Sequence, residues 1–299
     1  LGPSFPTRRS SDLANSINIS QPSVSLHIVI LEKYFNTRLI ERSNKQRKIL
    51  ITQTGEMLYK KAKQIISLLA ETKEEVSNYY NCSSGTLKIG ASMTIGEFLL
   101  PEILGEFIKE FPNINLEVTI QNTHDVYEKF KNYNIDIALT EGTVPKQNYT
   151  FKNFYKDTMV VVTPNCFTYK KNTVFATCLS NQTWIHREEG SGTGESLNRF
   201  LNAEGISPKS FIILGSNYAT KEAVKNNLGL SFISSLVVTA AADNNELKIL
   251  PTKRNYNRYF SYLIHEKNVP RIATLFIKKL EEYSNLISTE DIVIKDDEK

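Results

Sequence analysis

The chain has 299 residues, of which 40% are apolar and 10% aromatic. At about 150 residues per domain, this length predicts two domains with substantial cores and excludes a disordered tail protein. The longest uncharged stretch considered as a membrane span, Leu228 to Ala242, has only 15 residues and contains four serines and threonines. We therefore expect no membrane-spanning helix and no membrane partner.

Cysteine usage indicates the compartment. The three cysteines, Cys82, Cys166 and Cys178, are widely separated and form no C-x-x-C pair. This spacing excludes a zinc ribbon and a disulfide scaffold, so we expect a cytoplasmic protein without a bound cofactor. Cys166 and Cys178 are expected to be buried, small apolar side chains.

Positive charge is concentrated near the N-terminus. Residues 14–63 contain nine cations and three acids, a net charge of +6, whereas the whole chain carries +4. A basic block joined to a slightly acidic body predicts a module that meets a polyanion, attached to a module with another task.

The first thirteen residues lack helical or strand periodicity. The run Phe5 to Leu13 resembles a conceptually translated sequencing adapter. We therefore expect residues 1–13 to be a non-native segment, and we count neither Arg8 nor Arg9 as a DNA contact. The alternative is a genuine flexible arm.

A helix is predicted from Ser20 to Phe35. Ser20 is a suitable N-cap, and Pro22 lies in the first turn, where its missing N–H costs nothing. One apolar stripe is expected to face a core and consists of Val24, Ile28, Leu31 and Phe35. The opposite flank carries short hydrogen-bonding side chains, Gln21, Ser23, Ser25 and His27, which suit a helix in a DNA major groove.

Two apolar runs, 39–42 and 48–51, flank a cationic segment and predict a hairpin. With the end of a preceding helix at residues 14–18, the pattern predicts a winged helix-turn-helix. The alternative is an ordinary amphipathic helix followed by a solvated charged loop.

The order of several motifs resembles the LysR-type transcriptional regulators. These motifs are Ser20-Gln-Pro-Ser-Val-Ser25, Ile28, Leu31-Glu32, Arg38 to Arg42, and Thr52-x-x-Gly55. The resemblance implies a recognition helix whose DNA-facing start comprises Ser20, Gln21, Pro22, Ser23, Ser25, Leu26 and His27. The cationic hairpin adds Arg42, Lys45, Arg47 and Lys48 as expected DNA contacts. Leu26 stands where the family often has arginine, and the family's full first helix is expected to be missing, displaced by the adapter-like segment.

A long helix is predicted from Thr52 to about Tyr80. Its apolar residues follow heptad spacing and are Leu58, Ala62, Ile65, Leu69, Thr72, Val76 and Tyr79. Sustained heptads predict a coiled-coil homodimer, which the resemblance extends to a dimer or tetramer. The alternative is that this stripe packs on its own domain.

In the body of the chain, strand-like and helical runs alternate, which predicts a parallel α/β sheet. The expected strands are 86–91, 114–121, 135–140, 158–163, 183–186, 210–214, 230–233 and 259–264; the expected helices are 94–111, 125–132, 194–204, 218–226 and 271–287. The body resembles the two-lobed, periplasmic-binding-protein-like effector domain of the family. The expected domains are a winged helix-turn-helix at 14–54, a linker helix at 55–83 and an effector domain at 84–294. Lobe I is 84–163 with 259–294, and lobe II is 164–258, with crossings near Pro164 and Arg258.

Small polar residues follow several predicted strands, where open α/β sheets bind ligands. The candidate effector-binding residues are Ser92, Thr94, Ile95, Thr123, Thr140, Arg187, Ser191, Thr193, Asn217 and Thr220. The alternative is that the hydroxyl residues are plain helix caps and that Arg187 forms a surface ion pair. The stretch 94–101 is similar to family members linked to sulfur and carbon assimilation.

An enzyme is not expected. The four histidines are scattered, without metal-ligand spacing, and the segment 190–194 fits neither a phosphate loop nor a nucleophile elbow. The sequence predicts a DNA-binding transcriptional regulator controlled by a small, anionic metabolite between two lobes. Its expected partners are promoter DNA, the effector, further copies of the chain and, as a further candidate, RNA polymerase. The alternative is a cytoplasmic sensor or solute receptor without productive DNA binding.

Overall fold

The computed structural model describes residues 20–42, 49–77, 85–145, 149–168, 175–252, 254–266 and 269–293. The chain divides into two compact units, residues 1–70 and 71–299. The adapter-like segment, the helix end expected at 14–18 and the hairpin cations Lys45, Arg47 and Lys48 lie outside the described residues.

The first unit contains the predicted helix and a strand pair. Helix α2 (Gln21–Tyr34) begins after Ser20, whose hydroxyl accepts from the Ser23 amide at 3.4 Å. Strands β1 (Ile40–Arg42) and β2 (Ile49–Ile51) pair antiparallel. The expected core stripe is wrong in its second half: Val24 is buried, whereas Leu31 is 44% exposed and Phe35 46% exposed.

Helix α3 (Gln53–Ser77) follows β2 directly. The Thr52 hydroxyl accepts from the Gly55 amide at 3.0 Å, which caps its first turn. A Cβ atom at Gly55 would overlap the carbonyl oxygen of Leu39, so this close approach requires glycine. The heptad residues Ile65 and Leu69 are 65% and 68% exposed, so the alternative that this part of the stripe packs on its own domain is wrong.

The second unit is built on a mixed sheet. Its strands are β3 (Gly85–Ser92), β4 (Ile114–Gln121), β5 (Ile137–Glu141), β6 (Tyr149–Pro164), β9 (Ser231–Ser234), β10 (Leu247–Leu250) and β11 (Tyr256–His265). They follow the order β10-β6-β11-β5-β3-β4, with β9 also on β6. The parallel pairing expected from the alternation is right for β3, β4 and β5. It is wrong for β6 and β11, which pair antiparallel because one strand leaves lobe I and the other returns to it.

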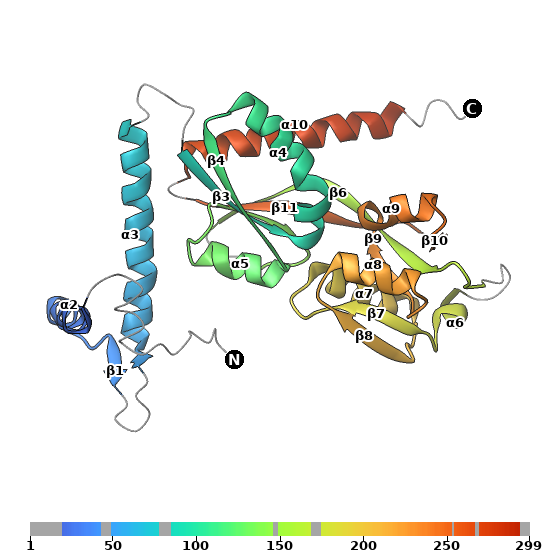
Figure 1. Ribbon diagram of the computed structural model, residues 1–299, viewed down its shortest axis with the longest axis horizontal. Coiled ribbons are helices and arrows are strands. Elements are labelled where there is room, and N and C mark those ends of the chain that lie inside the picture. Colours follow the sequence, from blue (N-terminus) through green and yellow to red (C-terminus); the bar gives the residue numbers. More distant parts are fainter. Residues whose placement is uncertain are drawn as a thin grey trace. The chain divides into compact units, whose positions relative to one another are not determined.

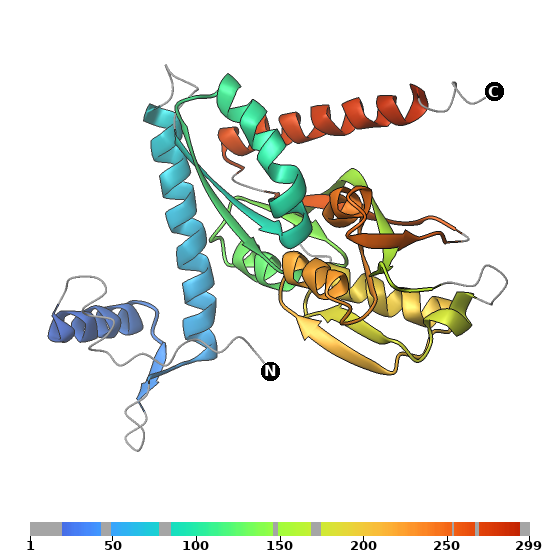
Figure 2. The same cartoon turned by 45° about the vertical axis from the view of Figure 1, so that its right-hand side comes forward.

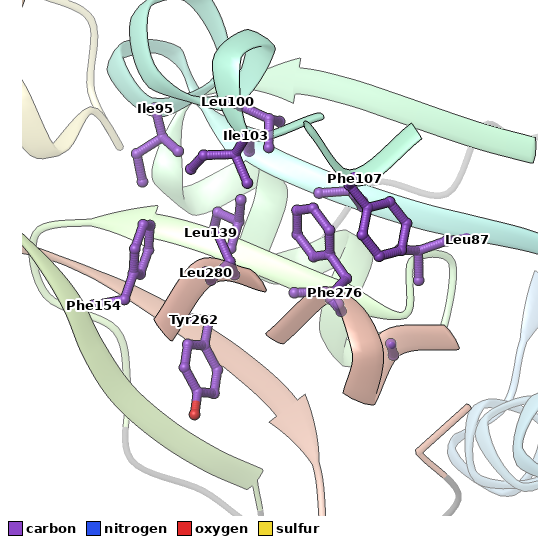
Figure 3. Packing of buried hydrophobic residues seen from close by; sticks show 14 of the residues in the cluster. Leu87, Ile95, Leu100, Ile103, Phe107, Leu139, Phe154, Tyr262, Phe276 and Leu280 are labelled. Carbon is purple, nitrogen blue, oxygen red and sulfur yellow. The ribbon is translucent and has the colours of Figure 1, made fainter. Parts of the chain in front are cut away.

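Helices cover both faces of the lobe I sheet. The π-helical turn η1 (Ile95–Leu99), α4 (Leu100–Glu110) and α10 (Arg271–Val293) lie on one face, and α5 (Thr123–Lys131) lies on the other (Figures 1 and 2). The core between the sheet and α4 and α10 includes Phe107 and Phe276, whose rings meet edge to face at 5.2 Å (Figure 3). The helix expected at 94–111 is right in its extent, since the chain stays helical from η1 through α4, but its first part is π-helical. Pro101, which has no N–H to donate, lies in the first turn of α4, directly after this π-helical part.

Lobe II surrounds a second core. It contains α6 (Phe175–Leu179), β7 (Thr183–Arg187), α7 (Gly192–Glu204), β8 (Ser210–Leu214), α8 (Asn217–Lys225) and α9 (Ser235–Asp243). Strands β7 and β8 pair in parallel, and Trp184 of β7 is fully buried. The uncharged stretch 228–242 contains β9 and most of α9. Helices α6 and α9 and strand β10 were not predicted from the sequence. The expected burial is wrong for Cys166, which is exposed, and for Cys178, which is only partly buried.

Strands β6 and β11 connect the two lobes. Residues 149–159 of β6 pair with β11, whereas residues 159–164 pair with β9 and β10 of lobe II. The chain therefore passes from lobe I to lobe II at Met159, before the crossing predicted near Pro164. The reason is that the apolar residues at the end of β6 pack in the lobe II core. Among the described helices, none is both long and apolar enough to cross a bilayer.

Candidate functional site

Three polar side chains lie side by side where the parallel strands of lobe I end. Ser92 pairs in register with Gln121 of β4, and the residues preceding Ser92 and Thr140 are also in register. The Ser92 and Thr140 hydroxyls and the Gln121 Oε1 atom are buried without a hydrogen-bond partner in the described structure. Because buried polar atoms are normally paired, these three atoms point to a ligand or ordered water at the sheet edge.

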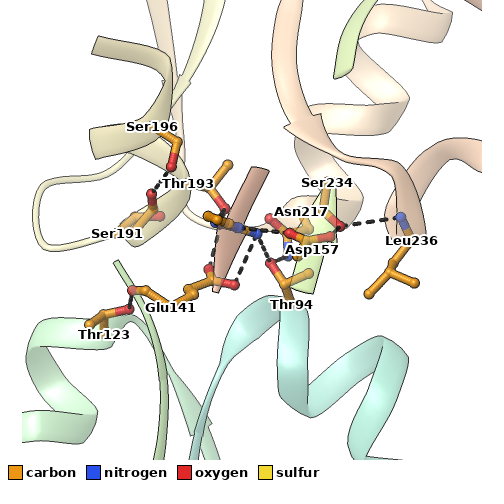
Figure 4. Close-up of polar contacts among 12 residues, drawn as sticks. Thr94, Thr123, Glu141, Asp157, Ser191, Thr193, Ser196, Asn217, Ser234 and Leu236 are labelled. Atoms are coloured by element: carbon orange, nitrogen blue, oxygen red, sulfur yellow. Dashed lines mark hydrogen bonds and ion pairs between the residues drawn. The ribbon is translucent and has the colours of Figure 1, made fainter. Parts of the chain in front are cut away.

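A buried guanidinium lies between the lobes. Arg258 on β11 donates from Nε to Asp157 Oδ2 at 2.7 Å, and its Nη2 atom lies 3.1 Å from Glu141 Oε2. The same group donates at 3.1 Å to the hydroxyls of Thr193 and Thr94. Figure 4 shows Thr94 and Glu141 approaching from lobe I and Thr193 from lobe II. Asp157 lies on β6, which together with β11 connects the lobes; we call these two strands the hinge. Arg258 therefore joins both lobes and the hinge through charge-assisted hydrogen bonds.

A second buried arginine extends this network. Arg187, at the end of β7, donates from Nη1 to Asn217 Oδ1 at 2.5 Å and forms a two-pronged pair with Glu188, both distances being 2.8 Å. Asn217 in turn donates from Nδ2 to Thr94 Oγ1 at 3.2 Å. The alternative of a surface ion pair is right for Arg187 in the pairing, with Glu188, and wrong in the location, because Arg187 is buried.

The lobes touch through backbone where the Gly190-to-Gly194 segment meets lobe I. The His124 amide donates to the Gly190 carbonyl at 3.1 Å, and a Cβ atom at Gly192 would overlap the carbonyl oxygen of Glu141. The Thr123 hydroxyl donates to that same carbonyl at 2.6 Å. Glycine at 192 thus permits lobe II to approach the end of β5 closely.

Burial sets the electrostatics of the site. It raises the pKa of the Asp157 carboxyl above its usual value of 3.8, and Arg258 and the Ser234 hydroxyl oppose this shift. Burial likewise raises the pKa of Glu97 on η1, with Arg187 lowering it and Glu141 raising it further. Because Glu141 and Asp157 pair with Arg258, and Glu188 with Arg187, both arginines are already neutralised by acids of the chain. Among the residues described, no group of three potential metal ligands gathers here.

The predicted effector residues divide into two groups. Thr94, Arg187, Thr193 and Asn217 belong to the network that joins the lobes, and Ser92, Thr123 and Thr140 lie at the ends of the lobe I strands. The others serve local structure: Ile95 packs in the lobe I core, the Ser191 hydroxyl accepts from the Gly194 amide and caps α7, and the Thr220 hydroxyl donates to the carbonyl of Ser216, the N-cap of α8. For Ser191 the alternative is right: its hydroxyl is a helix cap.

Sequence reasoning missed the charged partners. Asp157 and Arg258 are 101 residues apart, and Glu141 lies on a third strand. The available signal was an acid and a cation inside runs that become strands, since such residues are rarely buried unless they pair.

The predicted DNA-facing residues lie at the start of α2. The side chains of Pro22, Leu26 and His27 are exposed, and those of Ser23 and Ser25 are partly exposed. The Ser20 and Ser23 hydroxyls are 2.8 Å apart. The side chains of Gln21 and Arg42 lie outside what the structure describes, although their backbones belong to α2 and β1.

Comparisons with known proteins identify the family. The LysR substrate binding domain family matches residues 82–284. The chain is 39% identical to the HTH-type transcriptional regulator CysL of Bacillus subtilis over 84% of both chains. The chain belongs to the LysR-type transcriptional regulators. Another relative of this LysR-type regulator, the probable RuBisCO transcriptional regulator of Cyanidium caldarium, is 31% identical over 79% of this chain and 74% of the relative. These relatives are named as regulators rather than enzymes.

Solved structures share the architecture. A full-length OxyR variant from Pseudomonas aeruginosa matches this LysR-type regulator with a TM-score of 0.70 and 19% identity, over 93% of this chain and 90% of that one. The Synechocystis PCC6803 CcmR regulatory domain, solved in complex with 2-PG, matches with a TM-score of 0.61 and 23% identity, over 67% of this chain and 98% of that domain. The body is therefore a two-lobed, periplasmic-binding-protein-like effector domain.

Proposed function

We propose that this LysR-type regulator binds promoter DNA through a winged helix-turn-helix at residues 14–54 and dimerises through a linker helix at 55–83. Residues 84–294 hold a small anionic metabolite between the lobes. The ligand favours one lobe arrangement, and the linker transmits this preference to the DNA, so the mechanism is a shift in populations without catalysis.

The unpartnered oxygens of Ser92 and Thr140 carry the effector proposal. Hydroxyls that lack a partner can donate to an anion, and they lie beside a network that already joins both lobes. The anion would be held by hydroxyls and amides rather than by a free arginine, because the Arg187 and Arg258 charges are matched internally. In support, the CcmR domain of the same fold was solved with 2-PG, and a QuiR effector-binding domain with shikimate.

Substitution of Ser92 by alanine separates binding from stability. Because this hydroxyl has no partner among the residues that the structure describes, Ser92→Ala is expected to change the free energy of unfolding by less than about 0.5 kcal/mol. A bound anion at about 100 times its Kd stabilises the native chain by roughly 2.7 kcal/mol, and this gain should be lost in the variant. The measurement is the melting temperature of the full chain with sulfate, thiosulfate, an acyl-serine or a sugar phosphate.

Ser231→Ala is the matched control for this screen. The Ser231 hydroxyl is equally buried but donates to the Ile185 carbonyl at 3.0 Å, so its loss should cost about 1 kcal/mol while leaving the ligand shift intact. An equal ligand shift in Ser92→Ala would contradict the site. No shift with any of the four probes would contradict the anionic class.

The DNA proposal rests on α2. Its N-terminal turn is capped by Ser20 and presents exposed polar side chains, and free amides at a helix N-terminus attract phosphate. We expect affinity for a promoter duplex to fall steeply with salt, with a slope of log K against log salt near −0.9 for each phosphate neutralised. Fluorescence anisotropy of the full chain at several salt concentrations measures this slope. A flat dependence would favour the second candidate, a metabolite sensor without productive DNA binding.

Exposed apolar residues support a homo-oligomer. Ile65 and Leu69 on α3 have the heptad spacing of a coiled-coil seam. The edge strands β4 and β8 also expose apolar side chains, Ile120 and Ile213 among them. Edge strands with exposed apolar residues are normally covered, so a second copy of the chain is the expected partner at these sites.

A further inference from the structure

A cavity of about 690 Å³ lies beside the hinge strands and draws residues from both lobes. Lobe I contributes Thr143 and Asn153, lobe II contributes Ser196 and Arg199 of α7, and β11 contributes Tyr259. None of the described residues that line it is acidic. This volume is in the range of sites that hold small organic ligands.

The cations of the cavity differ in their availability. Arg258 is committed to Asp157 and Glu141, and Arg254 pairs with Glu204 at 2.6 Å. Arg199 is exposed, and its side chain contacts the Ser196 hydroxyl at 3.5 Å. Within the described part of the chain, Arg199 forms no ion pair, so its guanidinium is available to a carboxylate or phosphate.

The apolar part of the lining is aromatic. Phe200 and Phe232 stack at 4.3 Å and form a buried wall, against which Tyr256 packs edge to face. Tyr259 and Phe151 are 52% and 47% exposed, so their rings can accept a partner. Aromatic rings favour a further ring in stacked or edge-to-face geometry.

We propose that this hinge cavity binds an anion that carries an aromatic ring, with its acidic group on Arg199 and its ring against Tyr259 and Phe151. The site is separate from the cleft residues Ser92 and Thr140, which do not line the cavity. Arg258 lines the cavity and also bonds Thr94 and Thr193, so it forms the wall between the two sites. A ligand held by both lobes would favour the lobe arrangement that completes its contacts.

Phenyl phosphate is the probe, and isothermal titration calorimetry of the full chain is the measurement. Arg199→Gln is expected to weaken binding about tenfold, because the charge-assisted hydrogen bonds are lost. Ala203→Trp should abolish binding, since position 203 is an exposed helical residue whose enlarged side chain would fill the cavity. Circular dichroism checks that both variants remain folded.

Three further arms fix the interpretation. Arg271→Gln removes an exposed cation at the start of α10 and should leave phenyl phosphate binding unchanged. Ser92→Ala should also leave it unchanged, and inorganic phosphate or phenol alone should bind more weakly than the joined molecule. The proposal is overturned by no binding at millimolar phenyl phosphate, by unchanged binding in Arg199→Gln or Ala203→Trp, or by loss of binding in Ser92→Ala.

Discussion

Replacing Arg258 by leucine is expected to lower the free energy of unfolding by about 3 to 5 kcal/mol, because two buried carboxylates lose their counter-ion. Asp157 and Glu141 are both buried, and each lies within 3.1 Å of the guanidinium. Once Arg258 is removed, either carboxylate must be protonated or remain as an unpaired buried charge. Urea unfolding at neutral pH, followed by circular dichroism, measures this loss.

Two comparisons test the cause. Arg254→Leu removes a largely exposed arginine that pairs with Glu204 and should cost less than about 1 kcal/mol. Adding Asp157→Asn and Glu141→Gln to Arg258→Leu should recover much of the loss, because the neutral amides leave no uncompensated charge. A loss in Arg258→Leu no larger than that in Arg254→Leu would mean that the network contributes little to folding.

The same residues determine whether the free energy of unfolding rises or falls with pH. The pKa of Asp157 is raised in the folded chain, so between the unfolded value of 3.8 and the folded value the native state binds more protons. The contribution of this group to stability therefore decreases as pH rises through that window. In Arg258→Leu the cation that lowers the pKa of Asp157 is gone, so this pKa should rise further. The pH range over which stability decreases should therefore extend to higher pH.

Helix starts and strand bounds could be predicted from the sequence where they depend on residues within a single element. Ser20 and Pro22 identified the start of α2, and the strands at 114–121 and 210–214 were predicted with the bounds that the structure gives. Capping and strand propensity act over a few residues, so single-sequence reasoning reaches them.

Ion pairs and strand pairings between residues far apart in the sequence could not be predicted. The pairing of Arg258 with Asp157 and Glu141 requires three strands to meet, and the change of β6 from lobe I to lobe II depends on β9 and β10. The candidate site between the lobes was therefore predicted through Arg187 and the hydroxyls at strand ends, but Arg258, Asp157 and Glu141 were not predicted to hold it together. The cavity beside Arg199 left no sequence motif, because its lining comes from both lobes.

Gly192→Ala is expected to separate the lobes where α7 begins. The added methyl group would overlap the carbonyl oxygen of Glu141, and a backbone atom cannot move aside as a flexible side chain can. The neighbouring hydrogen bond from the His124 amide to the Gly190 carbonyl, 3.1 Å long, joins the same two segments and should break or lengthen. Hydrogen–deuterium exchange at the His124 amide is expected to accelerate at least about tenfold, because local opening there becomes less costly.

Gly105→Ala provides the matched control for this change. A Cβ atom at Gly105 meets nothing within 4 Å, and the residue lies inside α4. Alanine should therefore stabilise that helix by roughly 0.5 to 1 kcal/mol and leave His124 exchange unchanged. If Gly192→Ala also leaves the exchange of His124 unchanged, the close approach of α7 to β5 does not hold the lobes together. Accelerated exchange confined to Gly192→Ala would instead identify this glycine as the point where lobe closure is set, directly beside the Arg258 network that joins the same two lobes.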